Sequence, residues 1–192
     1  MDICVFASSS DRLDGVYYAG AERLGSLMAK EGFGLVFGGG REGLMGAVAK
    51  GAHSSGGRIT GIAPGFFNEP GILFDDCALI FTETMNERKN RMEDMADAFI
   101  VLPGGSGTLE EFFEVFTLKQ LGRNDKAIVL LNTAGYFTPL MSLLRESSKK
   151  GFISERSLAL IHVADTPEDA LGYIKVYKPQ TGDLNRLSDY GK

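Results

Sequence analysis

The segment from Pro103 to Glu111 holds the residues best suited to chemistry by type and spacing. It reads PGGSGTLEE, follows the apolar run AFIVL and opens a segment with helical spacing. Glycines let backbone N–H groups approach a phosphate closely, and a helix N-terminus adds partial positive charge and unpaired donors. No lysine follows these glycines, so the triphosphate pattern G-x-x-x-x-G-K-[ST] is not matched. The segment therefore predicts a site for a monophosphate.

Two acids, Glu110 and Glu111, follow this turn directly. Carboxylates in a first helical turn are common and mildly stabilising. Beside a bound phosphate, however, a carboxylate is repelled, so two acids at this place favour a catalytic task for at least one of them. The alternative is that both acids only stabilise the N-terminus of the helix.

Arg88 lies on the apolar stripe of a second predicted helix. Steps of three and four residues place it in line with Met85, Met92 and Met95. An inward guanidinium needs an anion or several acceptors, and it grips phosphate or carboxylate with parallel hydrogen bonds. Arg88 therefore predicts a contact with a ligand or with a structural carboxylate. Lys89 lies at the border of the stripe.

An earlier glycine-rich turn, GGGREG at 38–43, satisfies the dinucleotide pattern G-x-G-x-x-G. That interpretation needs an acidic residue about 20 positions later to hold the ribose. The following strand reads ITGIAPGFF, and no acid occurs before Glu69. The pattern therefore disfavours NAD or FAD and leaves a tight turn without a ligand as an alternative.

Composition excludes several classes of function. The net charge is −5 and no basic stripe is present, which argues against nucleic acid as a partner. No run approaches the ~20 apolar residues of a membrane span, and MDICVF lacks the features of a signal peptide. We expect a cytoplasmic protein without a membrane partner. Two histidines and two separated cysteines, Cys4 and Cys77, predict no metal site and buried free thiols.

Short apolar runs alternate with helical segments, which is typical of βαβ units and a parallel sheet covered on both faces. We predict a single-domain α/β fold, a Rossmann-like doubly wound parallel sheet over residues 1–177, with a polar C-terminal tail at 178–192. Strands are expected at 3–7, 34–37, 58–63, 78–82, 98–102, 127–131 and 160–164. Helices are expected at 15–30, 44–54, 85–95, 109–121, 136–149 and 167–176. Thr84 and Thr166 are predicted helix caps, and Gly32, Gly122 and Gly151 are predicted helix ends.

MNERKNRM at 85–92 and LPGGSGTLEE at 102–111 resemble the paired signatures of the Lonely Guy (LOG) family of cytokinin-activating phosphoribohydrolases. CVFASSS and GGGREGLMGAVAKGA resemble the family's first and second turns, so the resemblance covers nearly the whole chain. It implies hydrolysis of the N-glycosidic bond of adenosine 5′-monophosphates, with or without an N6 substituent. The products would be the free base and ribose 5-phosphate. It also implies a homodimer and no cofactor.

The resemblance assigns site residues one by one. The motif arginine falls on Arg88 and the closing glutamate on Glu111, with Glu110 adjacent, as the catalytic set. The implied substrate and phosphate contacts are Ser9, Gly39, Gly40, Met45, Lys89, Gly104, Gly105, Ser106, Gly107 and Thr108. Ser106 occupies a slot that is often aromatic in plant members, so the base preference stays open.

A carboxylate near C1′ and its attacking water would suit this reaction, because positive charge builds on the sugar as the base departs. Arg88 would fix the substrate or donate to the leaving base; the general acid stays unassigned. Similar sequences carry a lysine decarboxylase label, which we discount because that activity needs pyridoxal phosphate on a Schiff-base lysine. A non-enzymatic nucleotide or cofactor carrier is the main alternative. A DNA-binding relative is disfavoured by the acidic balance.

Overall fold

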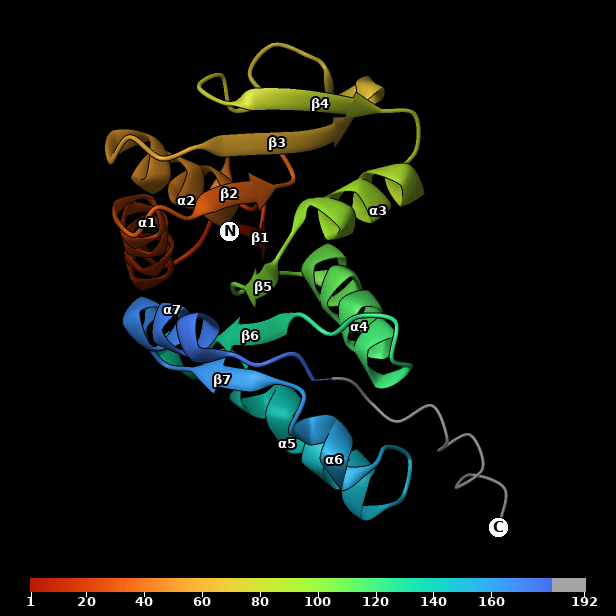
Figure 1. Cartoon of the computed structure of the whole chain (residues 1–192). Coiled ribbons are helices and arrows are strands. Elements are labelled where there is room, and N and C mark those ends of the chain that lie inside the picture. Colours follow the sequence, from red (N-terminus) through yellow and green to blue (C-terminus); the bar gives the residue numbers. More distant parts are fainter. Residues whose placement is uncertain (181–192) are drawn as a thin grey trace.

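Seven parallel strands form one sheet in the order β4-β3-β2-β1-β5-β6-β7 (Figure 1). The computed structural model describes residues 1–180. The strands are β1 (Asp2–Phe6), β2 (Gly34–Phe37), β3 (Ile59–Pro64), β4 (Ala78–Thr82), β5 (Ala98–Val101), β6 (Ala127–Leu131) and β7 (His162–Ala164). The α/β prediction with a doubly wound parallel sheet is confirmed.

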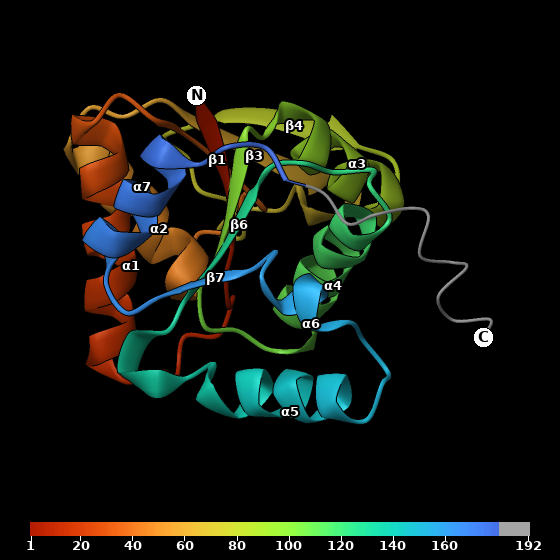
Figure 2. The same ribbon diagram turned by 60° about the horizontal axis from the view of Figure 1, so that its bottom comes forward.

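Helices cover both faces of the sheet. They are α1 (Gly15–Lys30), α2 (Gly43–Ser54), α3 (Met85–Met95), α4 (Ser106–Gln120), α5 (Thr138–Lys149), α6 (Glu155–Leu158) and α7 (Pro167–Val176), with short 3-10 turns η1 (Gly65–Phe67) and η2 (Thr133–Gly135). Side chains of β1 alternate between the two layers: Ile3 and Val5 pack with α1, α2 and α7, whereas Cys4 and Phe6 pack with α3, α4 and α5. Figure 2 shows α1, α2 and α7 grouped together, away from α3 and α4.

The winding of the sheet reverses at β1, which pairs with β2 on one side and β5 on the other. The carboxyl ends of β1 and β5 are therefore adjacent, and the Ser8 N–H donates to the Pro103 carbonyl at 3.2 Å. In open parallel sheets, ligands bind at such a switch point. The fold thus places the PGGSGT turn beside the turn that follows β1.

Most predicted elements match the observed ones to within one or two residues. Thr84 and Thr166 accept hydrogen bonds from the third residue of their helices, and Gly32, Gly122 and Gly151 have φ of +79°, +67° and +83°. These predictions are confirmed. The four-residue α6 was not predicted, and the last strand begins at His162 rather than at residue 160 because the turn after α6 extends to Ile161.

Two helices near the site begin at residues other than those predicted. Helix α4 begins at Ser106 instead of 109, because Gly105 is its N-cap and the glycine turn itself forms the first helical turn. Helix α5 begins at Thr138 instead of 136, since η2 and the hydrogen bond from Phe137 N to Asn132 Oδ1 hold the preceding residues in a separate turn.

Several further expectations concern absences and termini. Within residues 1–180, no helix combines the length and apolarity needed to cross a membrane. The same part of the chain holds no cluster of three or more metal-ligating side chains. Cys4 is buried and Cys77 half-buried, and both thiols are free. The predicted tail at 178–192 lies, from residue 181 onward, outside the described residues.

Candidate active site

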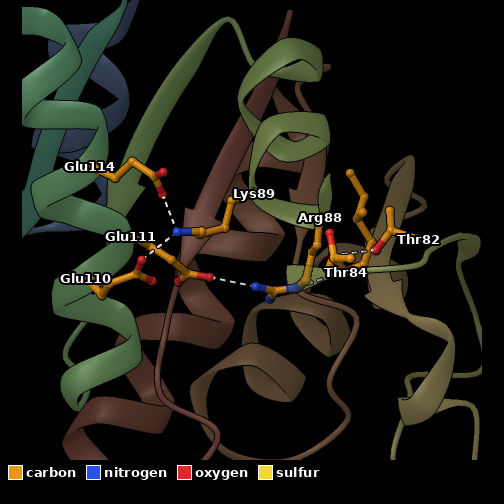
Figure 3. A network of polar contacts seen from close by, with 8 residues as sticks. Thr82, Thr84, Arg88, Lys89, Glu110, Glu111 and Glu114 are labelled. Carbon is orange, nitrogen blue, oxygen red and sulfur yellow. Dashed lines mark hydrogen bonds and ion pairs between the residues drawn. The ribbon is translucent and has the colours of Figure 1, made fainter. Parts of the chain in front are cut away.

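Arg88 points from α3 into the molecule and joins three elements (Figure 3). Its Nε donates to the Ile62 carbonyl of β3 at 3.0 Å, and its Nη1 donates to Glu111 Oε1 of α4 at 2.8 Å. The Arg88 and Glu111 side chains are only 8% and 12% exposed. The inward guanidinium predicted from the helical stripe is confirmed, whereas Met85, at the start of that stripe, is 42% exposed.

Two opposing effects set the pKa of Glu111. Burial raises it above the ordinary carboxyl value, and the charge and hydrogen bond of Arg88 lower it. Burial is the larger effect, so the pKa is raised on balance. Arg88 and Glu111 therefore form an ion pair that is largely shielded from water.

Lys89, the next residue of α3, bridges two other carboxylates of α4. Its Nζ lies 2.5 Å from Glu110 Oε1 and 2.9 Å from Glu114 Oε2 (Figure 3). The hydrogen bond to Glu110, followed by the contact with Glu114, raises the pKa of Lys89. This amine is therefore held in its charged form.

Glu93 extends this charged row by one helical turn beyond Lys89. The side chain is half-buried, and burial, followed by the negative charge of Glu114, raises its pKa to about 7. Lys126, whose Nζ donates to the Glu93 carbonyl at 2.7 Å, partly opposes this shift. Beyond Lys89, the facing sides of α3 and α4 thus bring two carboxyl groups, Glu93 and Glu114, near each other.

The first glycine-rich turn along the chain, GGGREG at 38–43, serves the protein's own packing. A Cβ at Gly38 would lie 2.0 Å from Arg88 Nη2, so glycine is needed for the guanidinium to reach its place. At the start of α2, where Gly43 has φ +62°, the Ser8 carbonyl accepts from the N–H groups of Leu44 and Met45 at 2.9 and 3.2 Å. These helix donors are already paired. The turn is therefore a tight junction, and the disfavoured dinucleotide interpretation gains no support.

The second glycine-rich turn differs in this respect. Gly105 supplies no capping side chain to α4, and within residues 1–180 the N–H groups of 105–108 donate to no protein acceptor. Gly105, Ser106 and Gly107 are exposed. Four backbone donors at a helix N-terminus are thus available to an anion.

The predicted site residues fall into two groups. Arg88, Lys89, Glu110 and Glu111 come together between α3 and α4. Met45 lies against the first turn, where a Cβ at Gly40 would be 2.8 Å from its Cε. The other predicted residues lie on the loops at this edge: Ser9 is exposed after β1, Gly39 is buried after β2, and Gly104 and Thr108 are buried in the second turn.

Three contributors to the site were not predicted. The Ile62 carbonyl holds Arg88, Glu114 shares Lys89, and the Tyr136 hydroxyl donates to the Gly104 carbonyl at 2.6 Å. Helical spacing alone could have indicated Glu114, which follows Glu110 by four residues on the same helix face. The other two contacts carry no local signal.

Known proteins resemble this chain in sequence and in fold. The family model described as "Possible lysine decarboxylase" matches residues 45–174. The probable cytokinin riboside 5′-monophosphate phosphoribohydrolase LOGL2 of Oryza sativa subsp. japonica is 37% identical over 93% of this chain and 73% of its own length. The corresponding enzyme LOG3 of Arabidopsis thaliana is 37% identical over 92% of this chain and 83% of its own.

Among solved structures, the molybdenum cofactor binding protein of Rippkaea orientalis superposes with a TM-score of 0.68 at 25% identity, covering 91% of this chain and 93% of that one. The match therefore extends to the fold as a whole. The two plant relatives likewise align over more than nine tenths of this chain. The chain belongs to the family of the LOG phosphoribohydrolases, whose family model bears the description possible lysine decarboxylase.

Proposed function

We propose that this protein hydrolyses the N-glycosidic bond of adenosine 5′-monophosphates, with or without an N6 substituent. The products are the free base, a cytokinin or adenine, and ribose 5-phosphate. The observation that carries this proposal is the buried pair of Arg88 and Glu111, which lies at the switch point of the sheet near a helix N-terminus with free donors. The names of the plant relatives support the same reaction.

Glu111 is proposed to act at the anomeric carbon. Positive charge develops on the ribose as the C1′–N9 bond breaks, and a carboxylate in a largely dry site stabilises that charge strongly. The same carboxylate can orient the attacking water, whose oxygen forms the new bond to C1′. Glu110 is the second candidate for this role, although Lys89 already engages one of its oxygens.

Arg88 is proposed to orient Glu111 and to donate hydrogen bonds to the substrate. A guanidinium does not give up its proton in proteins, so Arg88 is not assigned as the general acid. Its hydrogen bond to the Ile62 carbonyl holds the guanidinium in place. Correct placement of this kind lowers the barrier by holding reacting groups in position.

The second glycine turn is proposed to bind the 5′-phosphate through Gly104, Gly105, Ser106, Gly107 and Thr108. Gripping the substrate at a point remote from the breaking bond converts binding energy into correct placement. The same edge of the sheet is proposed to be lined by Ser9 after β1 and by Gly39, Gly40 and Met45 at the first glycine-rich turn. Lys89 remains a proposed substrate contact, although its amine is engaged by two carboxylates.

The lysine decarboxylase description is not supported by the lysines of the site. A Schiff-base lysine must lose its proton to attack a carbonyl. Lys89 has a raised pKa because carboxylates hold its proton. Lys119 has a pKa lowered to about 8 by burial, but it has no exposed surface and donates to Tyr177 Oη and the Lys126 carbonyl.

A non-catalytic carrier is the second candidate function, and the solved structure of the molybdenum cofactor binding protein favours it. A carrier needs the phosphate turn but has no use for a buried carboxylate beside it. The cost of keeping Glu111 away from water therefore favours the hydrolase.

We also propose a homodimer. Helix α4 buries Phe112, Val115 and Phe116 in the core. Phe113 on the same helix and Leu121 at its C-cap are nevertheless 38% and 39% exposed. A helix with apolar side chains around most of its circumference is suited to a core on one side and an interface on the other. The cytoplasmic location stays a prediction.

The test is incubation of the purified protein with adenosine 5′-monophosphate and its N6-isopentenyl derivative, with free base followed by chromatography. Glu111→Gln keeps the shape and should lower turnover by about a hundredfold or more. Glu168→Gln, which alters an exposed pair with Arg23, is the control and should leave turnover unchanged. Nucleotide binding without base release in the wild type would support the carrier instead.

A further inference from the structure

Tyr136 joins the β6–α5 connection to the second glycine turn. Its hydroxyl donates to the Gly104 carbonyl at 2.6 Å, and its side chain is partly exposed. The ring packs edge-on against Tyr17, with centroids 6.1 Å apart, and against Phe137 at 5.1 Å. The Tyr136 hydroxyl thus bonds directly to the backbone of the second glycine-rich turn, at the peptide that joins Gly104 to Gly105.

The Gly104 carbonyl and the Gly105 N–H belong to one peptide unit. The peptide is trans, so these two groups point in opposite directions. When Tyr136 holds the carbonyl on its own side, the Gly105 N–H must face the other way. Gly105 is exposed, and a Cβ on it would meet no atom within 4 Å, so there is open space around this residue.

Two glycines flank this peptide, which makes its rotation easy, since glycine adopts positive and negative φ with similar cost. After rotation, the peptide would offer a carbonyl oxygen where it had offered a donor. A phosphate is attracted by the N–H group and repelled by the carbonyl dipole. The hydroxyl of Tyr136 therefore selects between an anion-binding and an anion-repelling turn.

We propose that Tyr136 is a positioning residue that locks the Gly104–Gly105 peptide with its N–H toward the substrate phosphate. The inference rests on the proposed phosphate-binding role of this turn and adds a residue to it. The backbone next to Tyr136 is fixed independently of the hydroxyl, because Asn132 Oδ1 accepts from Phe137 N at 2.7 Å. Tyr136→Phe thus removes the lock and keeps the ring and the connection in place.

The matched control is Tyr17→Phe. This change deletes the same hydroxyl from the neighbouring ring, and within residues 1–180 the Tyr17 hydroxyl makes no hydrogen bond. Ribose 5-phosphate binding is measured by calorimetry, and KM and kcat are measured with adenosine 5′-monophosphate. Loss of one hydrogen bond and of the preferred peptide orientation should weaken ribose 5-phosphate binding by about five- to tenfold in Tyr136→Phe.

The KM should rise by a similar factor while kcat at saturation is retained, because the other backbone donors of the turn still place the bound nucleotide. The one weakened contact would then affect ground state and transition state alike. Tyr17→Phe should match the wild type in all three quantities. Equal ribose 5-phosphate affinity in Tyr136→Phe and the wild type overturns the inference, as does a fall in kcat with KM unchanged. A wild type that binds neither ribose 5-phosphate nor the nucleotide overturns the proposed function itself.

Discussion

Replacing Arg88 by methionine tests whether Arg88 stabilises the fold by compensating the buried charge of Glu111. The change removes the donors to Glu111 and to the Ile62 carbonyl, which lie 2.8 and 3.0 Å from the guanidinium. Removing one partner of a buried pair costs about 3–5 kcal/mol, because the remaining charge is left without compensation. For a chain of this size we expect the melting temperature at pH 8 to fall by about 10 °C.

The pH dependence gives the sharper signature. The pKa of Glu111 is raised by burial and lowered by Arg88, so it must be higher still in Arg88→Met. A carboxyl with a raised folded-state pKa is destabilising when ionised and harmless when protonated. The stability difference between wild type and variant should therefore be largest at pH 8 and should shrink as the pH falls toward 5.

Thermal unfolding of both proteins from pH 5 to pH 8 measures this difference. Arg23→Met is the control, because Arg23 and Glu168 form a surface pair with side chains 65% and 45% exposed. Such pairs contribute about 1 kcal/mol or less. An equal melting temperature of Arg88→Met and the wild type at pH 8 would contradict this reasoning. A melting-temperature difference that is as large at pH 5 as at pH 8 would also show that the buried charge of Glu111 is not its cause.

Two further perturbations probe the surroundings of the pair. Gly38→Ala places a methyl group 2.0 Å from Arg88 Nη2, so base release should fall by about tenfold or more through misplacement; Gly172→Ala on α7, where a Cβ meets nothing within 4 Å, should retain wild-type turnover. Glu93→Gln should raise the melting temperature above pH 7 and leave it unchanged at pH 4. Because the pKa of Glu93 is raised to about 7 in the folded protein, ionisation of this carboxyl lowers stability only at pH values above the ordinary carboxyl pKa. A gain at pH 4 equal to that at pH 8 would contradict this explanation.

The sequence predicted the parts of the site that depend on local spacing. The helical stripe indicated an inward Arg88, and the strand-to-helix position of PGGSGT indicated free donors at a helix start. The beginning of α4 was predicted three residues too late. Ser106, Gly107 and Thr108 contribute no apolar side chains to the helical pattern, so the pattern does not indicate the first turn. Sequence patterns locate buried helix faces better than helix ends.

Contacts between distant segments could not be predicted from spacing. Gly38 fits a dinucleotide pattern, yet its lack of a side chain is needed by Arg88, which lies 50 positions later. The hydroxyl of Tyr136 reaches Gly104 across 32 residues, and nothing around Tyr136 in the sequence indicates a polar partner. The contact of Tyr136 with Gly104 follows from the order of the strands, which brings the ends of β5 and β6 together.

The charged side chains between α3 and α4 indicate which groups of the site can bind a phosphate. Arg88 and Lys89 face three carboxylates, those of Glu110, Glu111 and Glu114. Both cations are already paired, and the cluster carries more negative than positive charge, so it offers a phosphate no net attraction. The backbone N–H groups of the second glycine turn must then supply most of the binding. This makes the orientation of a single glycine peptide, and so the hydroxyl of Tyr136, matter more here than in a site with a free lysine or arginine.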